Sequence, residues 1–339
     1  MKKILALDGG GIRGIIPGQI LVVLESKLKL RSGNPDARIA DYFDFFAGTS
    51  TGGILTCIHL CPDLTNPGKA RFSAQEAVDL YIEHGGKIFN IGLYEKFIAV
   101  GGMLNEKYNA APLEKCLHDY FGDLQLSQLL KPSIITSYDI ENRNAHFFAQ
   151  HDFIKKGAGG DFYVRDVCRA TSAAPTYFET ALVKSLSNVS YPLVDGGVFA
   201  NNPALCAYSE VRNSAGLPTA SDMFIVSIGT GSENKSYSYK KVKDYGALGW
   251  IEPLIDIMMS GASETTHYHL TKMFAAQNNS ANYIRIQPSS IRNAAYAMDN
   301  ATPENIQALI EVGTVTAQDC EELDRIVDVL ITDKDSVTF

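Results

Sequence analysis

Two apolar runs near the start of the chain each lead into a glycine-rich turn and then into a segment with helical periodicity. "KILAL" at residues 3–7 precedes "DGGGIRG", and "FDFFAG" at residues 43–48 precedes "TSTGG". A strand, a tight turn and a helix form the repeating unit of α/β proteins, whose strands pair in parallel. Further strand-like runs lie at residues 133–140, 146–149, 223–229 and 282–287. This order predicts an α/β fold with a mainly parallel sheet covered by helices on both faces.

The remainder of the sequence gives no sign of a second domain. The 339 residues contain no internal repeat, low-complexity run or proline-rich linker. Near the C-terminus, Thr302 and Pro303 have the form of a helix cap and first helical residue, and two apolar stripes at helical spacing follow. We therefore expect one domain over residues 1–339, with C-terminal helices at about 303–332.

Charge and cysteine content argue against several classes of function. The formal net charge of −8 argues against nucleic-acid binding, which needs a clustered basic surface. It leaves contact with a membrane surface open, because a local patch can act against the global sign. The six cysteines form no CxxC pair and have no repeating spacing, so we expect neither a disulfide framework nor a zinc site.

The N-terminal residues "MKKILALDGGG" bear on localisation. Their apolar run has five residues, which is shorter than the roughly 7–15 residues of a signal-peptide core. No stretch reaches the roughly 18 apolar residues of a membrane span. We expect a cytoplasmic protein with at most peripheral contact with membranes, unless a leader was removed before this sequence begins.

The first glycine loop allows more than one interpretation. Gly9, Gly11 and Gly14 match the GxGxxG pattern of dinucleotide-binding turns, but Glu25 comes too early for the acidic residue expected about 20 positions on. No Lys-Ser or Lys-Thr pair follows, which excludes a phosphate-binding P-loop. A tight turn from strand to helix explains the glycines equally well.

The second glycine loop, "GTSTGG" at residues 48–53, has the GxSxG pattern of a nucleophile elbow between a strand and a helix. Small neighbours allow the sharp turn that exposes the serine Oγ, and a helix N-terminus favours negative charge there. We predict that Ser50 is a catalytic nucleophile, the alternative being a solvent-facing serine in a glycine-rich turn. The glycines of this loop are Gly48, Gly52 and Gly53.

A reacting ester needs at least two N–H donors that face the developing oxyanion. The residue after the nucleophile, Thr51, supplies one amide in an elbow of this kind. The first loop can supply the others, since no side chain blocks the approach of the ester there. Arg13 is either a helper beside this oxyanion hole or a surface residue of the following helix. The donors that we expect from the first loop are the amides of Gly9, Gly10 and Gly11.

A third loop, in "YPLVDGGVFANNPAL", carries an acidic residue at the end of an apolar run. Asp195 is followed by Gly196 and Gly197, and we expect it on an exposed turn that can approach the serine as a base. Taken alone, a common Asp-Gly turn is the better explanation of this pattern. The other two loops favour the catalytic interpretation.

The three loops together resemble the patatin-like phospholipase family. The resemblance rests on "DGGGIRG", "GTSTGG" and "DGG", with further similarity at "GIIPGQIL", "ATSAAPTYF" and "SIGTG", and it spans nearly the whole chain. It implies a lipid acyl hydrolase with a serine–aspartate dyad, in which Ser50 is the nucleophile and Asp195 its base. It also implies an oxyanion hole from residues 9–11, no metal or cofactor, and a three-layer α/β/α sandwich.

The histidines are poorly placed to replace the dyad by a Ser-Asp-His triad. Only His267 and His269 follow Asp195 in the chain, and they lie in a helix-like segment rather than on a loop after a strand. The dyad requires Asp195 to take the serine proton directly. Because an ordinary aspartate has a pKa near 3.9 and is a poor match to that task, we expect partial desolvation to make Asp195 a more effective base.

The segment at residues 234–259 could meet a membrane or micelle surface that presents the lipid substrate. It interleaves lysines with tyrosines and the single tryptophan, Trp250. The alternative is a polar loop that leads into a buried helix, and we favour burial for the helix stripe Ile251, Leu254, Ile255 and Met258. The lysines are Lys235, Lys240, Lys241 and Lys243, and the tyrosines are Tyr237, Tyr239 and Tyr245.

Two other functions remain compatible with the sequence. The chain could be a storage or binding protein with incidental esterase activity, because fold alone does not fix function. It could also be a membrane-degrading effector that a small ligand activates. Oligomeric state, acyl-chain length and headgroup preference are not encoded in any motif of the sequence.

Overall fold

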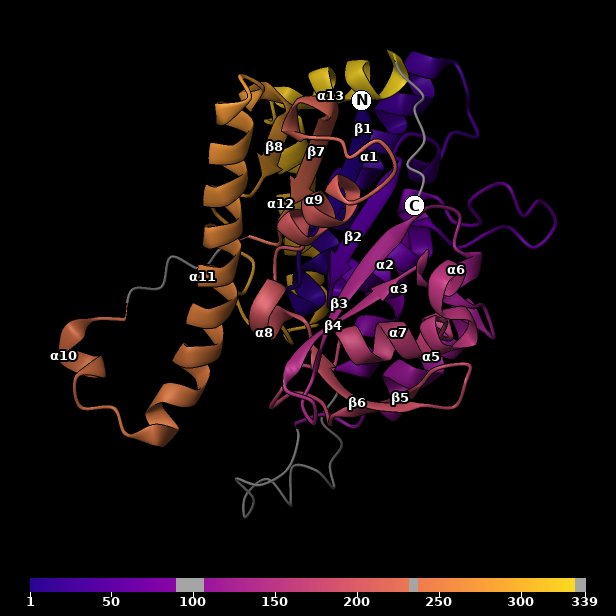
Figure 1. The fold of residues 1–339 in the computed structure, drawn as a ribbon. Coiled ribbons are helices and arrows are strands. Elements are labelled where there is room, and N and C mark those ends of the chain that lie inside the picture. The colour runs from indigo at the N-terminus through magenta and orange to yellow at the C-terminus, as the bar shows by residue number, and fades with distance from the viewer. Residues whose placement is uncertain (90–106, 232–236, 333–339) are drawn as a thin grey trace.

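The computed structural model describes residues 1–89, 107–231 and 237–332. Within these residues an eight-stranded sheet has the order β5-β6-β3-β2-β1-β7-β8, and β4 pairs with β3 beside this path (Figure 1). The strands are β1 (Lys2–Leu7), β2 (Phe45–Thr49), β3 (Ser133–Asp139), β4 (Asn144–Ala149), β5 (Ala181–Lys184), β6 (Ser190–Asp195), β7 (Met223–Ile228) and β8 (Tyr283–Ile286).

Five of these strands run parallel to one another. β1 pairs in parallel with β2 and β7, β2 with β3, and β7 with β8, whereas β4, β5 and β6 pair antiparallel to their neighbours. The predicted mainly parallel α/β sheet is therefore confirmed. The sequence did not predict β5 and β6, because their exposed residues and Pro192 interrupt the apolar pattern.

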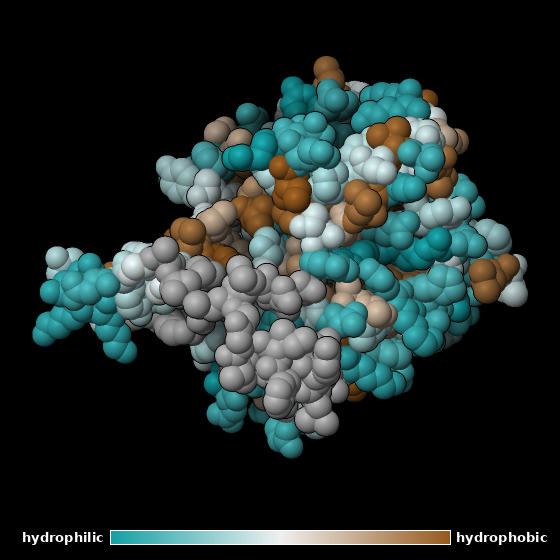
Figure 2. Space-filling model, turned by 90° about the horizontal axis from the view of Figure 1, so that it is seen from below, coloured by the Kyte–Doolittle hydropathy of each residue, from teal (hydrophilic) through white to brown (hydrophobic). Residues whose placement is uncertain are grey.

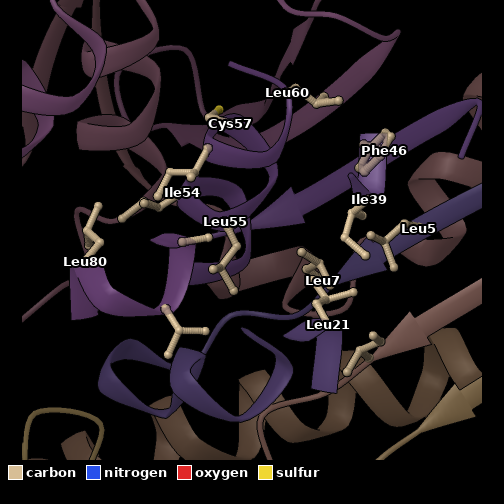
Figure 3. Close-up of a cluster of buried hydrophobic side chains, with 14 of the residues drawn as sticks. Leu5, Leu7, Leu21, Ile39, Phe46, Ile54, Leu55, Cys57, Leu60 and Leu80 are labelled. Atoms are coloured by element: carbon tan, nitrogen blue, oxygen red, sulfur yellow. The ribbon is translucent and has the colours of Figure 1, made fainter. Parts of the chain in front are cut away.

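Alternate residues of the sheet face two separate hydrophobic layers. In β1, Leu5 and Leu7 belong to the larger cluster, and Ile4 and Ala6 belong to the smaller one on the opposite face. Successive side chains of a strand point to opposite faces, so both faces of this sheet are covered. Figure 3 shows part of the larger cluster, where leucines and isoleucines from β1, α1 and α2 meet. The fold has three layers, as the family resemblance implies.

The larger layer contains most of the helices, and the smaller layer is built by α9 and α11. The larger layer comprises α1 (Ile15–Ser32), α2 (Thr51–His59), α3 (Ala74–Ile88), α5 (Ala111–Phe121), α7 (Val164–Thr171), α12 (Pro303–Gln318) and α13 (Glu322–Thr332). The smaller layer contains α9 (Ala204–Arg212) and α11 (Ala247–Ala276). Three short helices are α6 (Asp152–Lys156), α8 (Gly197–Ala200) and α10 (Tyr239–Val242).

The C-terminal helices pack against the N-terminal part of the chain. At Gly313 of α12, an added Cβ would lie 2.8 Å from the carbonyl oxygen of Ile16 in α1, so the two helices approach closely. The Thr302 hydroxyl accepts from the Asn305 amide and caps α12. The buried Lys3 ammonium of β1 donates to the Leu330 carbonyl of α13 at 2.9 Å.

Helix α11 flanks the body, and its N-terminal half extends away from the sheet toward α10 (Figure 1). The expectation of a buried stripe on this half is wrong for Leu254, which is 51% exposed, and for Met258, which is 42% exposed. Ile255 is half-buried, and the side chain of Ile251 lies outside the described part of the structure. The spacing of apolar residues identified an apolar face of this helix, but the side chains of Leu254 and Met258 on that face remain exposed to solvent. None of the described helices, α11 included, is long and apolar enough to cross a membrane.

Candidate active site

The sheet register brings the second and third loops together. Thr49 at the end of β2 pairs with Thr136 of β3, and Ser137 of β3 pairs with Asp195 at the end of β6. The last residues of β2 and β6 thus pair with neighbouring positions in the middle of β3, so the two strands end at the same level. Ser50 and Asp195 therefore lie on either side of the same position of β3.

Ser50 has the backbone of a strained elbow. Its φ of 54° and ψ of −125° lie in a region that residues with side chains seldom adopt. The Ser50 amide donates to the Thr171 hydroxyl at 2.8 Å, and that hydroxyl donates to the Thr136 carbonyl at 2.6 Å. The Ser50 carbonyl accepts from the amides of Gly53 and Ile54 in the first turn of α2. These bonds hold the elbow in place at the start of the helix.

The glycines of the elbow permit backbone contacts that a Cβ would prevent. A Cβ at Gly52 would lie 2.2 Å from the Leu7 carbonyl oxygen, and a Cβ at Gly48 would lie 2.4 Å from the Gly52 oxygen. The start of α2 is thus pressed against the end of β1, which carries the first loop. Gly14, Gly53 and Gly196 make similarly close contacts with the side chains of Thr51, Thr171 and Thr136, respectively.

Asp195 is buried, so the expectation of an exposed turn is wrong. Its side chain is held between the β-strands and α8, and the residue is 4% exposed. Its amide donates to the Ala173 carbonyl at 3.0 Å, and its Oδ1 accepts from the Gly197 amide at 2.7 Å. Burial raises the pKa of Asp195 to about 7, while hydrogen bonds from the Ser50 hydroxyl and the Gly197 amide offset part of the rise. This carboxyl can exchange a proton with the serine near neutral pH.

The first loop lies beside the elbow, but its three amides differ in availability. The Gly9 amide donates to the Asn201 carbonyl at 3.1 Å and is committed to that bond. The amides of Gly10 and Gly11 have no hydrogen-bond partner within the described residues. Gly11 has a φ of 59°, a conformation that favours glycine. The set of first-loop donors for an oxyanion therefore narrows from three amides to two.

Hydrogen bonds with Asn201, Thr230 and Met298, all far away in the sequence, hold the first loop. The Thr230 hydroxyl donates to the Gly9 carbonyl at 2.9 Å, and the Ile12 amide donates to the Met298 carbonyl at 2.8 Å. The Thr51 amide, at the first position of α2, faces no intrahelical acceptor and completes the set of donors.

Arg13 supports the first loop rather than lying free on the surface. Its guanidinium donates to the Gly10 carbonyl at 3.5 Å and to the Gly231 carbonyl at 3.3 Å. The side chain thus ties the first loop to the segment after β7. This geometry matches a positioning role beside the donors.

An apolar cavity of about 100 Å³ opens onto Ser50 and Asp195. Its walls come from α2, α3, α5, residues 174–178, α8, α11 and the segment that contains Met298. Such a wall suits a hydrocarbon chain and excludes water from the reacting groups. Its apolar lining includes Ile54, Leu80, Ile88, Phe89, Leu113, Phe178, Val198, Ile255, Met258 and Met259.

Neither candidate histidine reaches this cavity. His267 Nδ1 lies 3.1 Å from the Tyr283 hydroxyl and lines a second, neighbouring cavity, and both His267 and His269 are exposed residues of α11. The apolar cavity is lined by Ser50 and Asp195 and by neither histidine. Within the described residues, no group of three His, Cys, Asp or Glu side chains could hold a metal ion.

We predict that His267→Ala and His269→Ala each keep most of the esterase activity, within about threefold of wild type, because no proton path includes them. The measurement is kcat/KM with a soluble ester, with circular dichroism to verify folding. A loss of about 100-fold in a folded variant would support a triad instead.

Several residues of the site carried no recognisable signal in the sequence. Thr171, Asn201 and Met298 anchor the elbow and the first loop, and Arg285 forms an ion pair with Asp8 at 2.5 Å. The strings "ATSAAPTYF" and "FANNPAL" contain Thr171 and Asn201, but nothing in them assigns those contacts. Arg285 lies in "ANYIRIQ", another segment that resembles the family, but nothing in it assigns the contact with Asp8, and Met298 stands outside any motif.

Comparisons with known proteins identify the family of this chain. A family model described as "Patatin-like phospholipase" matches residues 5–208. "Patatin-like protein 2" of Arabidopsis thaliana is 37% identical, covering 92% of this chain and 82% of the relative. "Patatin group D-2" of Solanum tuberosum is 34% identical, covering 92% of this chain and 83% of the relative. The solved structure of human GIVD cytosolic phospholipase A2 aligns with a TM-score of 0.46 at 13% identity. The alignment covers 97% of this chain and 60% of that chain, and this likeness is too distant to support an argument. The matched family model and the extent of the alignments place this chain in the patatin-like phospholipase family.

Proposed function

We propose that Ser50 and Asp195 form the catalytic dyad through which this lipid acyl hydrolase cleaves fatty-acyl esters. The observation that carries the proposal is the buried Asp195, which lines the same apolar cavity as Ser50. Burial raises the pKa of this carboxyl to about 7, which suits a general base. The strained elbow holds the hydroxyl at the mouth of an apolar cavity.

In the first step, Asp195 takes the Ser50 proton while Oγ attacks the ester carbonyl carbon. The amides of Gly10, Gly11 and Thr51 would stabilise the oxyanion of the tetrahedral intermediate. The intermediate collapses, the carbon–oxygen bond to the alcohol breaks, and Asp195 returns the proton to the departing alcohol. The product is an acyl-enzyme whose chain lies in the apolar cavity.

In the second step, Asp195 takes a proton from water, whose oxygen attacks the acyl carbonyl carbon. The same amides hold the second oxyanion, and Ser50 recovers its proton as the bond to Oγ breaks. The fatty acid leaves, and both residues return to their starting states. The two steps need no group other than these residues, the substrate and water.

We expect intact-mass analysis after exposure to a fluorophosphonate to show one adduct on wild type and none on Ser50→Ala. The adduct reports an activated serine, because it forms only when the serine oxygen attacks the phosphorus atom. No adduct on folded wild-type protein would contradict the proposal. If an adduct formed only after a cyclic nucleotide was added, the effector function would replace constitutive hydrolysis.

The pH dependence of kcat/KM follows from the general base. Asp195 must be deprotonated to accept the serine proton. We therefore expect kcat/KM to fall about tenfold for each pH unit below the pKa of about 7. The profile with a soluble ester should show a single ionisation near pH 7 and a plateau above it. A profile that stays flat from pH 5 to pH 8 would contradict a raised pKa at Asp195.

We further propose that the substrate is taken from a membrane or micelle surface through the N-terminal half of α11. Leu254, Ile257 and Met258 are exposed there, and Met258 also lines the apolar cavity. Figure 2 shows hydrophobic side chains gathered on this side of the body, next to the hydrophilic segment that protrudes at the left. An exposed apolar surface continuous with the acyl cavity gives a lipid chain a short path inward.

The exposed lysines beside this surface come from α10 and the residue after it. Lys240, Lys241 and Lys243 are exposed, as are Tyr239 and Tyr245. Lysine side chains of this kind can meet lipid headgroups while the tyrosines lie at the boundary. Lys235, the fourth lysine of the expected set, lies outside the described residues.

The double variant Leu254→Asp with Ile257→Asp should bind lipid vesicles at least tenfold more weakly in a flotation assay. Each aliphatic side chain that leaves water is worth about 1.5–3 kcal/mol, and both are lost here. Tyr268→Asp is the control, since Tyr268 is 60% exposed on the other half of α11. Equal flotation of both variants would remove α11 from the interface.

We also infer that the chain forms one catalytic domain. The family model ends at residue 208, yet the first loop is held by Thr230 and Met298. Leu309 of α12 and Ile326 of α13 share the larger hydrophobic cluster with Leu5 of β1. The C-terminal third thus contributes to the same core and the same site.

A further inference from the structure

A second cavity, of about 620 Å³, lies beside the apolar one, and the two share part of a wall. Ser50 and Asp195 line the apolar cavity only. Most side chains around the second cavity are polar or charged, so it is roomy and polar enough to hold water. The shared wall therefore separates a space for water from the proposed base. It contains Tyr177, Ile255, Met259 and Met298.

The Met259 side chain of this wall extends to the neighbourhood of Asp195. Helix α11 packs on α8, which begins at Gly197, two residues after the base. A Cβ at Gly197 would lie 3.1 Å from Asp195 Oδ1 and 3.4 Å from Met259 Cε. The carboxyl and the methionine methyl group therefore border the same point of α8. A residue without a side chain at position 197 lets the two groups come this close.

A hydrogen bond holds the relevant face of α11 in place. Ile255, Met259, Ser263 and His267 line the second cavity at a spacing of four residues, which puts them on one face of the helix. The Ser263 hydroxyl accepts from Nδ2 of Asn201, the residue directly after α8, at 3.3 Å. This bond joins the face that carries Met259 to the end of α8. Met259 itself is half-buried.

Charged neighbours do not explain the state of Asp195. Burial raises its pKa to about 7, and the Ser50 hydroxyl and the Gly197 amide lower it in part. Among the described residues, no charged side chain of β3, α2, α8 or α11 contributes to this pKa. Cover by apolar atoms is therefore what disfavours the charged form of the carboxyl. The titratable and charged groups nearby line the second cavity, beyond the shared wall, and they are Asp8, Arg13, Asp256, Glu264, His267 and Arg285.

We propose that the Met259 side chain keeps the water of the second cavity away from Asp195 and thereby sets the pH range in which the dyad works. The inference rests on the proposed function, because it concerns the base of that dyad. Met259 takes no proton in the reaction and acts through Asp195, so it is a positioning residue. Without this side chain the two cavities would join beside the carboxyl, and hydration would stabilise its charged form. The pKa of Asp195 would then fall toward that of an ordinary aspartate.

The test is the pH profile of kcat/KM with a soluble p-nitrophenyl ester. Its midpoint should lie near pH 7 in wild type and at least about one pH unit lower in Met259→Ala, because water then reaches the carboxyl. Met259→Leu restores an apolar cover and should keep the wild-type midpoint. Met273→Ala is the matched control and should also keep it, since Met273 is an exposed methionine of the same helix that lines neither cavity.

Urea unfolding gives a second measurement that needs no activity. The stability of wild type should fall between about pH 5 and pH 8, because the folded state keeps a proton on Asp195 that the unfolded state has released. In Met259→Ala the folded state releases this proton at lower pH, so the fall in stability over the same range should be smaller. Met259→Leu should show the fall of wild type.

The outcomes separate this inference from the proposed function. A wild-type midpoint in Met259→Ala, or equal shifts in Met259→Ala and Met259→Leu, would overturn the role of Met259. In both cases Ser50-dependent hydrolysis by wild type with a midpoint near pH 7 would still support the dyad. If wild type showed no Ser50-dependent hydrolysis at any pH, the dyad and this inference would fail together.

Discussion

Asp195→Asn should lower kcat/KM about 1,000-fold, within the range of about 10²–10⁴ that a general base contributes. The amide keeps the shape of the carboxyl, so Oδ1 can still accept from the Gly197 amide. It cannot take the Ser50 proton. The measurement is hydrolysis of a soluble ester, together with fluorophosphonate labelling, which should also be lost.

The same variant should be more stable than wild type above pH 7. Between about pH 4 and pH 7 the folded state keeps a proton on Asp195 that the unfolded state has released, so wild-type stability falls as the pH rises through this window. A rise of the pKa from 3.8 to about 7 corresponds to a cost of about 4 kcal/mol that is fully present above pH 7. Asparagine has no charge to bury and avoids this cost.

Urea unfolding of both proteins at pH 5 and pH 8 measures the effect. The free energy of unfolding of wild type should drop between these pH values by more than that of Asp195→Asn, and the variant should unfold at higher urea at pH 8. An active variant would refute the role of Asp195 as base. An identical pH dependence of stability in both proteins would show that the carboxyl is not held at a raised pKa.

Gly52→Ala should destabilise the fold and lower kcat/KM about 100-fold. The new Cβ would lie 2.2 Å from the Leu7 oxygen and 2.7 Å from the Asp8 oxygen, and both atoms belong to the backbone at the end of β1. Overpacking of this kind costs about 1–3 kcal/mol, and a shift of the nucleophile by about 1 Å costs about 100-fold in rate. Helix propensity acts in the opposite direction by about 1 kcal/mol and is too small to compensate.

Gly261→Ala is the control for Gly52→Ala. Gly261 also lies inside a helix, but a Cβ there meets nothing within 4 Å, so the substitution should raise stability by up to about 1 kcal/mol. Urea unfolding and kcat/KM of both variants give the comparison. If Gly52→Ala were as stable and as active as Gly261→Ala, the close contact between α2 and β1 would not constrain the elbow.

The parts of this fold that the sequence predicted are those encoded locally. The GxSxG pattern at 48–53 specifies its own sharp turn, and "KILAL" specifies its own strand, because the needed residue types are neighbours in the chain. The strands β5 and β6 are short and half-exposed, so their pattern is weak. They become strands by pairing with each other and with β3.

The parts that the sequence did not predict depend on contacts between distant segments. The burial of Asp195 comes from β3 and α8, and the bond between the Gly9 amide and Asn201 joins residues about 190 positions apart. The exposure of Leu254 depends on what lies opposite α11, which periodicity cannot report. In each case the local pattern allowed two outcomes, and tertiary packing selected one.

The hydrogen bonds that hold the first loop join it to residues that are synthesised late. Ser50 and Asp195, the proposed dyad, leave the ribosome well before Thr230 and Met298, which hold the loop with two of the proposed oxyanion donors. A growing chain can thus form its nucleophile and base while the donors still lack their anchors. Hydrolytic activity should therefore appear only when synthesis is nearly complete.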